Sequence, residues 1–103
     1  MIARIWNAQA TTRNAPRYAR FFRGFANGEM TRMKGFVRAE LLLRNATRTG
    51  VVDITVITYW ASMNAIRAFA GTPIDRARVE PEARPLLSRS SRTVKHFEVE
   101  VFE

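Results

Sequence analysis

The stretch VVDITVITYWASMNAIRAFAG, residues 51–71, decides the fold, because a strand pattern passes directly into a helix pattern within it. Residues 51–60 alternate with the period of a β-strand. One face of that strand carries Val52, Ile54, Val56, Thr58 and Trp60. Ser62 is a typical helix N-cap. The helix after it has an apolar stripe of Met63, Ile66, Phe69 and Ala70, and Gly71 ends it.

Toward the N-terminus, the pattern predicts two more strands and a helix. Residues 2–8 are rich in β-branched and aromatic residues and predict a first strand. Asn14 is the expected cap of a helix that ends at 27–28. Its apolar stripe, at positions i, i+3, i+4 and i+7, consists of Tyr18, Phe21, Phe22 and Phe25. Residues 35–45 predict a second strand, joined to 51–60 as a hairpin through a turn at 49–50.

Toward the C-terminus, prolines divide the chain into short pieces. Residues 73–79 predict a short helical segment, 81–89 a helical turn and 93–102 a fourth strand. The order is therefore β-α-β-β-α-β within one domain, residues 1–103. This order predicts an α+β, ferredoxin-like fold with a four-stranded antiparallel sheet and both helices on one face.

The sheet face without helices is expected to be too apolar to meet water alone. By strand alternation, this face is assigned Ile2, Trp6, Phe36, Leu42, Val51, Ile57, Val94 and Phe102, with Tyr59 at its rim. It also receives charges of both signs, namely Arg4, Arg38, Glu40, Asp53, His96 and Glu98. A homodimer that packs two such faces together would bury them, with the charges as interface ion pairs. A monomer with a solvated face is the alternative.

Composition excludes several classes of protein. The net charge of +8 comes from fifteen arginines and two lysines against nine acids, but the arginines are scattered and no nucleic-acid motif is present. This pattern favours a solvated basic surface over a nucleic-acid partner. With no cysteine and one histidine, the chain has no disulfide and no ordinary structural zinc site. The absence of a long apolar run argues against a membrane span or signal peptide and predicts a cytoplasmic protein.

Nearly the whole chain resembles the antibiotic biosynthesis monooxygenase-like family, which forms dimeric α/β barrels. The resemblance is carried by MIARIW, YWASMNAIRAFAG, PIDRARVEPEARPLL and TVKHFEVEVF. It includes the W-x-S-x-x-A pattern of Trp60, Ser62 and Ala65. The family includes cofactor-independent monooxygenases of aromatic phenols, haem-degrading monooxygenases and members without demonstrated catalysis. Their site lies in a cleft between the sheet and its helices.

The resemblance also places residues of the haem-degrading group on this chain. Asn7 matches their asparagine, and Phe69 stands where they carry tryptophan. Their haem-ligating histidine falls near Val79, which cannot bind iron. Met30 and Met63 are soft donors, but methionine at helical spacing is usually core. The haem reading thus loses its main support, and we expect neither a cofactor nor a metal site.

Asn7 and Trp60 are the leading candidates for catalysis. Asn7 shares the parity of Ala3 and Ile5, which predicts that it points toward the helices. There it would hydrogen-bond a substrate oxygen and stabilise an oxyanion, or else bond a loop backbone. Trp60 would either wall a ligand cleft or pack in the core at the strand-to-helix turn.

The remaining candidates have plain structural alternatives. Phe22, Phe25 and Phe69 would line a substrate pocket or form ordinary core. His96 would be a general base or a dimer-interface histidine. Arg84 would reach an anionic group at the cleft mouth or remain solvated. The sequence thus predicts a cofactor-independent monooxygenase acting on a small aromatic or enolisable substrate. The alternative is a non-catalytic dimeric module that binds a small hydrophobic ligand or a protein.

Overall fold

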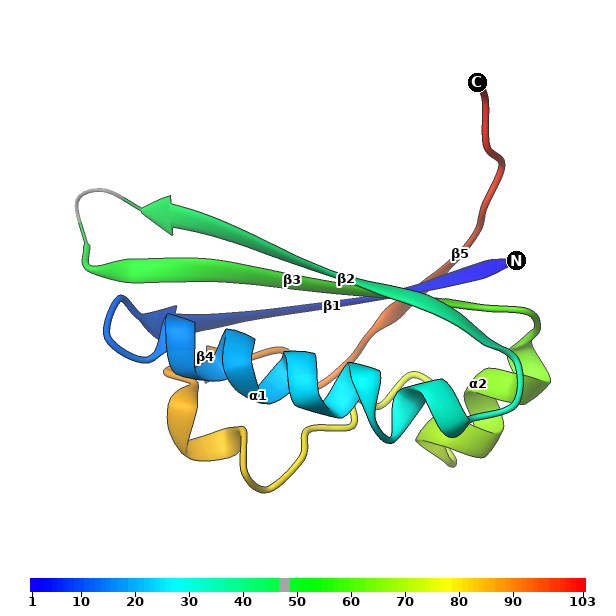
Figure 1. The fold of residues 1–103 in the computed structure, drawn as a ribbon, viewed down its shortest axis with the longest axis horizontal. Coiled ribbons are helices and arrows are strands. Elements are labelled where there is room, and N and C mark those ends of the chain that lie inside the picture. The colour runs from blue at the N-terminus through cyan, green and yellow to red at the C-terminus, as the bar shows by residue number, and fades with distance from the viewer. Residues whose placement is uncertain (47–48) are drawn as a thin grey trace.

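The computed structural model describes residues 1–46 and 49–103, and it consists of a sheet covered on one side by helices (Figure 1). The helices and strands are β1 (Ile2–Thr11), α1 (Ala15–Asn27), β2 (Phe36–Ala46), β3 (Val51–Trp60), α2 (Met63–Ala70), β4 (Arg89–Ser90) and β5 (Lys95–Glu98). Single 3-10 turns lie at η1 (Met30–Arg32) and η2 (Arg84–Leu86). The predicted turn of the β2–β3 hairpin is described from Thr49 onward, because 47–48 lie outside the described residues.

All strand pairs are antiparallel, in the order β2-β3-β1-β4, with β5 also paired to β1. The predicted ferredoxin-like α+β fold is therefore confirmed. The end of the chain differs from the prediction, because the strand expected over 93–102 is restricted to β5. After Glu98 the chain leaves the sheet on the side away from the helices (Figure 1).

The short helix expected over residues 73–79 is wrong. This segment turns at residues 73–76, where the Arg76 amide donates to the Pro73 carbonyl at 3.1 Å, and it then runs beside the residues that lead into β5. Arg76 forms an isolated bridge with Thr93, and the Val94 amide donates to the Asp75 carbonyl at 2.8 Å. The carbonyls of Ile74 and Arg76 accept hydrogen bonds from the buried Arg4 side chain. Because these carbonyls are already bonded, they are not available to a helix.

The predicted orientation of β1 is also wrong. The register places Arg4 opposite Thr58, Trp6 opposite Val56 and Ala8 opposite Ile54, so the even-numbered residues of β1 face the helices. The sequence could not decide this, because both parities of β1 carry large apolar residues. Asn7 consequently lies on the uncovered face and is exposed.

A β-bulge changes the face of Phe36. Phe36 pairs with Trp60, but the next partner pair is Arg38 with Tyr59, so Val37 is an extra residue in β2. Phe36 was expected on the uncovered face and instead packs under the helices, with its ring edge-on to Trp60 at 5.3 Å. One inserted residue inverts the alternation on its N-terminal side.

The faces predicted for β5 are reversed as well. His96 pairs with Arg4 and shares the helix-covered face, and Val94 beside β5 is buried. Phe97 pairs with Ala3 on the uncovered face and is 50% exposed. His96 is therefore not part of the predicted dimer face, whereas Phe97 is exposed on it.

The core lies between the sheet and the helices, and Trp60, Met30, Ile54 and Ile66 are its largest fully buried side chains. Ser62 caps α2 as predicted, because its Oγ accepts from the Ala65 amide at 3.2 Å. Asn14 makes no side-chain cap bond at α1. The core is thus organised around the strand-to-helix junction that starts at Trp60.

Gly35 allows close contact between the start of β2 and α2. Its φ of +86° lies in the left-handed region that favours glycine. A Cβ at this position would lie 2.5 Å from the Cβ of Ala65. The Gly35 carbonyl also accepts from the Ala61 amide at 2.7 Å. These contacts fix the height of α2 above the sheet.

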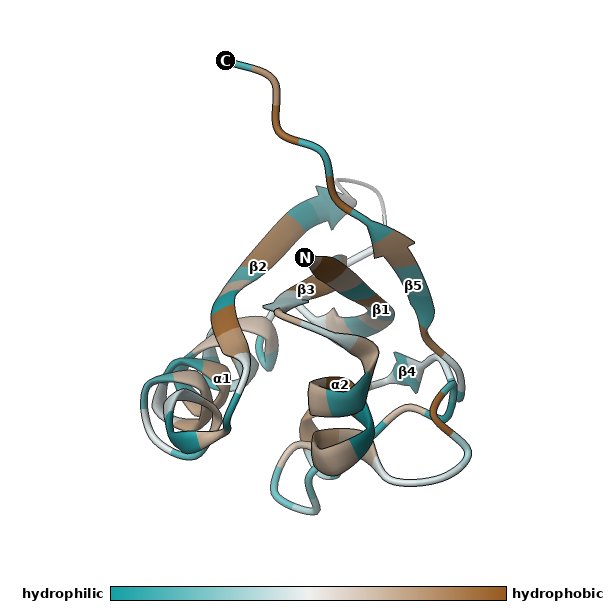
Figure 2. Cartoon of the chain, turned by 90° about the vertical axis from the view of Figure 1, so that its right-hand side faces the viewer, coloured by the Kyte–Doolittle hydropathy of each residue, from teal (hydrophilic) through white to brown (hydrophobic). Residues whose placement is uncertain are grey.

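The uncovered face and the C-terminal tail carry exposed apolar residues. Leu42 in β2 is 47% exposed, and Val101 and Phe102 in the tail are 66% and 86% exposed. Figure 2 shows hydrophobic and hydrophilic positions alternating along this tail as it leaves the sheet. Within the described residues, no helix combines the length and apolarity needed to span a membrane.

Candidate functional site

A cavity of about 60 Å³ lies between the helix-covered sheet face and the helices. It is lined by Arg4, Trp6, Tyr18, Phe21, Phe22, Phe25, Met30, Val56, Thr58, Phe69, Arg78, Val79, Glu80, Ala83 and Val94. Because a water molecule needs about 10–15 Å³ of such space, the cavity has room for roughly four to six waters. Its lining is mostly apolar with a few polar groups, which is the usual composition of a small-molecule site.

Aromatic rings from α1 and α2 form one wall of the cavity. Tyr18 and Phe22 stack with their centroids 6.2 Å apart, and Phe21 and Phe25 stack at 5.9 Å. Phe25 also meets Phe69 of α2 at 6.5 Å. Burial raises the pKa of Tyr18 above its ordinary value, so its phenol stays protonated at neutral pH. The wall is therefore apolar and uncharged.

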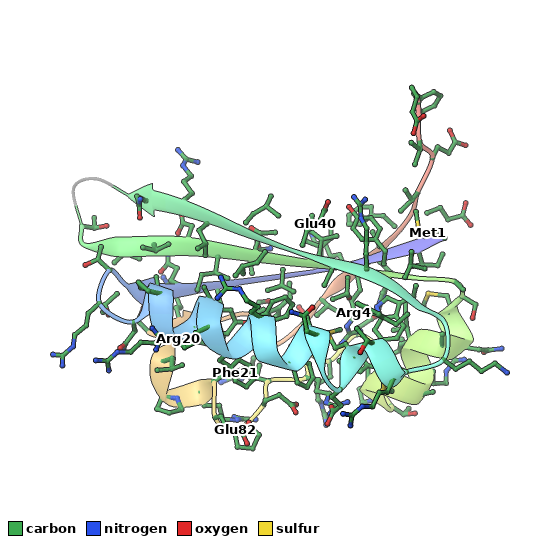
Figure 3. All side chains as sticks on the ribbon, viewed as in Figure 1. Met1, Arg4, Arg20, Phe21, Glu40 and Glu82 are labelled. Carbon is green, nitrogen blue, oxygen red and sulfur yellow. The ribbon has the colours of Figure 1, made fainter. Side chains whose placement is uncertain are left out.

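The sheet side of the cavity contains a buried arginine. Arg4 is 4% exposed, and Figure 3 shows it between the sheet and the helices. Its Nη1 donates to the Ile74 carbonyl at 2.9 Å, and its Nη2 donates to the Arg76 carbonyl at 3.0 Å. Burial lowers the pKa of Arg4 to about 10, with the charge of Asp75 acting in the other direction. The guanidinium therefore remains positively charged at neutral pH.

His96 accepts the third hydrogen bond of Arg4. Its Nε2 lies 3.0 Å from Nη1 of Arg4, and arginine can only donate, so Nε2 must be unprotonated. The ring proton is then on Nδ1, which lies 3.4 Å from Oδ1 of Asp75. Burial and the charge of Arg4 lower the pKa of His96. The histidine is thus a neutral link between Arg4 and Asp75.

The outer side of the cavity has a salt-bridged arginine. Arg78 pairs with Glu29 at 2.7 Å and with Glu80 at 3.0 Å, and its guanidinium carbon lies 4.6 Å from the centroid of the Phe69 ring. Its Nη1 donates to the Phe69 carbonyl at 2.9 Å. These bonds connect η1, α2 and the following loop. Glu80 is the one carboxylate among the described residues that line the cavity.

A larger hollow of about 830 Å³ lies elsewhere, and Asn7, Leu42, Asp53 and Thr55 are among its lining residues. Arg44 and Arg89 border it. Much of this lining belongs to the uncovered sheet face, and the hollow is open to solvent. Its described lining has no aromatic residue and no buried charge, so its composition resembles a contact surface more than a small-molecule pocket.

Several solved structures share this fold over nearly the whole chain. The haem-degrader MhuD from Mycobacterium tuberculosis, with two haems in its active site, is 24% identical with a TM-score of 0.64 over 100% of this chain and 99% of that chain. A proposed antibiotic biosynthesis monooxygenase from Bacillus cereus is 14% identical with a TM-score of 0.64 over 99% and 97%. SnoaB, a cofactor-independent oxygenase from Streptomyces nogalater, is 21% identical with a TM-score of 0.59 over 98% and 95%.

The chain has the fold of the antibiotic biosynthesis monooxygenase-like proteins. No protein-family model matches the sequence, and no curated protein matches it. At these identities the likeness shows the fold of the chain, and its chemistry has to be argued from its own residues.

Within this monooxygenase-like fold, the structure brings only some of the predicted site residues together. Phe22, Phe25 and Phe69 line the cavity, as the pocket interpretation required. Asn7 does not: its Oδ1 accepts from the Thr55 hydroxyl at 2.9 Å on the opposite sheet face. Arg84 is exposed in η2 and is not among the lining residues.

Trp60 is core rather than cavity wall. It is fully buried, does not line the cavity, and packs against Phe69 at 5.0 Å between ring centroids. Its indole Nε1 donates to the Thr58 hydroxyl at 2.8 Å. Thr58 does line the cavity, so Trp60 acts on the cavity only through Thr58 and Phe69.

The sequence reasoning missed the polar half of the site. Arg4 was placed in the dimer face, and Thr58 and Glu80 were not singled out. The available signal was cross-strand register: once Trp60 is known to face the helices, its pairing with Ile2 brings Arg4 and Thr58 to that side. That pairing could not be read from β1 alone.

Proposed function

We propose that the chain is a cofactor-independent monooxygenase of a small aromatic or enolisable substrate, bound in the cavity between the sheet and the helices. The observation that carries this proposal is a partly open, aromatic-lined cavity beside a buried positive charge, in a fold shared with oxygenases. Its volume of about 60 Å³ favours a small substrate. A whole ring would require the half-buried Phe21 and Phe25 to move outward.

The proposed reaction needs no external reductant. A methylene of an enolisable substrate, or the ring carbon para to a phenol hydroxyl, becomes a carbonyl: the substrate loses two hydrogens and gains one oxygen atom, while the second atom of O₂ leaves as water. The four electrons that O₂ accepts thus all come from the substrate. Deprotonation makes the substrate an electron donor, and we assign that proton to Glu80, a lining carboxylate whose oxygens also bind Arg78. The aromatic wall excludes water from the reactive anion.

The residues of the cavity do not fit a haem. His96 is the one histidine of the chain, and its unprotonated nitrogen is already bonded to Arg4. Tyr18 is held in its neutral form, and Met30 is packed in the core. The cavity volume is also far below the roughly 300–1,000 Å³ of drug-sized ligand pockets, and a haem is much larger than the one-ring substrate proposed. No step of the proposed reaction therefore involves haem.

Oxygen consumption tests the proposal. The purified chain, without added metal or flavin, is incubated with a panel of one-ring hydroxyaromatics and cyclic β-diketones in an oxygen-electrode cell. We expect one substrate class to consume one O₂ per molecule of product formed. Glu80→Gln should lower the rate by about 10²–10⁴-fold, as loss of a general base does. Glu82→Gln, in the same loop but outside the cavity, is the matched control. Binding without oxygen consumption across the panel would instead support a non-catalytic ligand-binding module.

We also propose that two copies pack through their uncovered sheet faces. Leu42 and Phe97 are each about half exposed there, and Arg38 and Glu40 offer charges of both signs. The C-terminal tail leaves the sheet on the same side with Phe102 exposed (Figure 1). Burying such a face is the usual reason for dimer formation.

Sedimentation velocity tests this second proposal. We expect the wild-type chain to sediment as a dimer at micromolar concentration and Leu42→Glu to sediment as a monomer. Ala68→Glu adds the same charge at an exposed position of α2 and should leave the dimer intact. A wild-type chain that remains monomeric at high micromolar concentration would exclude the proposed interface.

A further inference from the structure

The buried charge of Arg4 indicates which class of ligand the cavity binds. It lines the cavity, it is 4% exposed, and it stays charged at neutral pH. Burying a charge is costly unless an opposite charge or several hydrogen bonds compensate for it. The partners of Arg4 therefore show whether its charge is fully compensated by the protein.

All the direct partners of Arg4 are neutral. They are two backbone carbonyls and the unprotonated nitrogen of His96. No carboxylate of the described residues forms a salt bridge with Arg4, and Asp75 reaches it only through His96. By contrast, Arg38 and Arg78 both have carboxylate partners, although both are far more exposed. The most buried charge thus lacks an acid.

Arg4 also has unused donors. A guanidinium has five N–H groups, and the described residues accept three hydrogen bonds from it, two from Nη1 and one from Nη2. The Nε hydrogen and one Nη2 hydrogen therefore remain. Two guanidinium N–H groups commonly bind one anionic oxygen group together.

Thr58 supplies another donor beside Arg4. The two residues are direct partners across β1 and β3, so their Cβ atoms are about 4.5–5.5 Å apart on the same face. The Thr58 oxygen already accepts from the indole of Trp60, and no acceptor for the Thr58 hydroxyl hydrogen occurs among the described residues. Trp60 thereby orients Thr58, whose hydroxyl is free to donate within the cavity lining.

We propose that the cavity binds its substrate as an organic anion, whose ionised oxygen is held by Arg4 and Thr58 while its ring lies against the aromatic wall. This inference rests on the proposed function for the identity of the bound molecule as a substrate. The ligand class is a small planar phenolate, enolate or carboxylate. Arg4 and Thr58 stabilise the anion, and Trp60 is a positioning residue that acts through Thr58.

Ligand binding under anaerobic conditions tests the inference without any turnover. Benzoate and the neutral isostere benzamide are titrated by calorimetry into the wild-type chain. We expect benzoate to bind at least about tenfold more tightly, because hydrogen bonds to charged groups contribute more than neutral ones. Equal affinity, or failure of both ligands to bind at millimolar concentration, would overturn the inference.

4-Nitrophenol separates a phenolate from a carboxylate ligand. Its ionisation is read from its visible absorbance, so binding beside Arg4 should lower the apparent pKa of the bound phenol. If only benzoate shows the anion preference, the site recognises carboxylates. If nitrophenol also binds as its anion, the site accepts phenolates, as the proposed oxidation requires.

Variants assign the effect to residues. Arg4→Met should abolish the preference for benzoate, and Thr58→Val should reduce it severalfold, whereas Arg38→Met on the opposite sheet face should leave it unchanged. If Arg4→Met does not fold, Arg4→Lys keeps the charge and should retain a reduced preference. A preference that persists in Arg4→Met would overturn the role of Arg4. Anion binding without oxygen consumption would remove the proposed oxygenase function and leave the anion site standing.

Discussion

The arginines on the two faces of the sheet differ in their exposure and in the charge of their partners. On the uncovered face, the Arg38 side chain is 61% exposed, pairs with Glu40 at 2.6 Å and lies 4.8 Å from the ring centroid of Tyr59. On the covered face, the nearly inaccessible Arg4 has only neutral partners. Figure 3 shows Arg4 and Glu40 on opposite sides of the same sheet. The exposed charge of Arg38 has a carboxylate partner, and the largely buried charge of Arg4 has none among the described residues.

This contrast separates an interface from a binding site. An exposed pair such as Arg38–Glu40 contributes little to stability, but it can set the register between two packed surfaces. A buried guanidinium with free donors keeps an unfavourable charge in the folded protein. Such an arrangement suits a cavity that is completed by an anion, and the following experiments test the contrast.

The largest difference is expected between two neighbouring residues of β3. Trp60→Ala removes the largest buried side chain, which should lower the free energy of unfolding by about 3–5 kcal/mol. Tyr59→Ala, on the uncovered face, should lower it by about 1 kcal/mol. Urea denaturation followed by circular dichroism measures both. Similar losses for the two variants would mean that both faces are equally packed.

The next difference concerns the two arginines. Arg4→Met leaves two carbonyls and His96 without their donor, so we expect a loss of about 3 kcal/mol in the free energy of unfolding. Arg38→Met should change it by about 0–1 kcal/mol. The same denaturation experiment applies, with benzoate added in a second series. Benzoate should stabilise the wild-type chain and Arg38→Met but not Arg4→Met.

A smaller effect should be visible in the pH dependence of stability. The pKa of His96 is lower in the folded chain than its ordinary value of about 6.5, because of burial and the charge of Arg4. The unfolded chain therefore binds the proton first, and stability falls as the pH drops through about 6.5. His96→Gln, whose amide oxygen can still accept from Arg4, should flatten this part of the profile. Melting temperatures between pH 8 and pH 5 provide the measurement.

The smallest effect should be a change in the titration of Tyr59. The hydrogen bond that Tyr59 donates to Glu40 at 2.8 Å raises the pKa of the phenol. Glu40→Gln should lower that pKa toward its ordinary value of about 10, with little change in stability. Ultraviolet titration, with Tyr59→Phe to identify the signal, checks it. An unchanged titration would show that the pair does not persist in solution.

The sequence predicted the element order because the long strands and α1 have clear periods. Residues 51–60 alternate without a break, and every predicted inward residue of that strand is buried. Ser62 could be recognised as a cap because it lies between the end of that strand at Trp60 and the start of the helical pattern at Met63. The aromatic wall followed from the helical spacing of Phe22 and Phe25. These features depend on local sequence alone.

The polar part of the site could not be predicted, because it depends on contacts between residues that are far apart in the sequence. β1 has large apolar residues at both parities, so only its pairing with β3 shows that Arg4 points inward and Asn7 outward. The bulge at Val37 places Phe36 on the helix-covered face, and the pairing of β5 with β1 places His96 there too, whereas both were predicted on the uncovered face. The carbonyl partners of Arg4 come from residues 74–76, about seventy positions away. No periodicity within one strand contains that information.

The distance between α2 and the sheet depends on the absence of a side chain at Gly35. Helix α2 carries Phe69, which lines the cavity, and its Ala65 lies close to Gly35 because glycine has no side chain. A methyl group added at Gly35 would push the two segments apart. Gly35→Ala should strain the backbone at this φ and also lift Phe69 away from the sheet, and the benzoate site should then accept bulkier bicyclic acids such as naphthoate. The size limit of this cavity would thus be set by a glycine in the turn before β2, a residue that does not itself line the cavity.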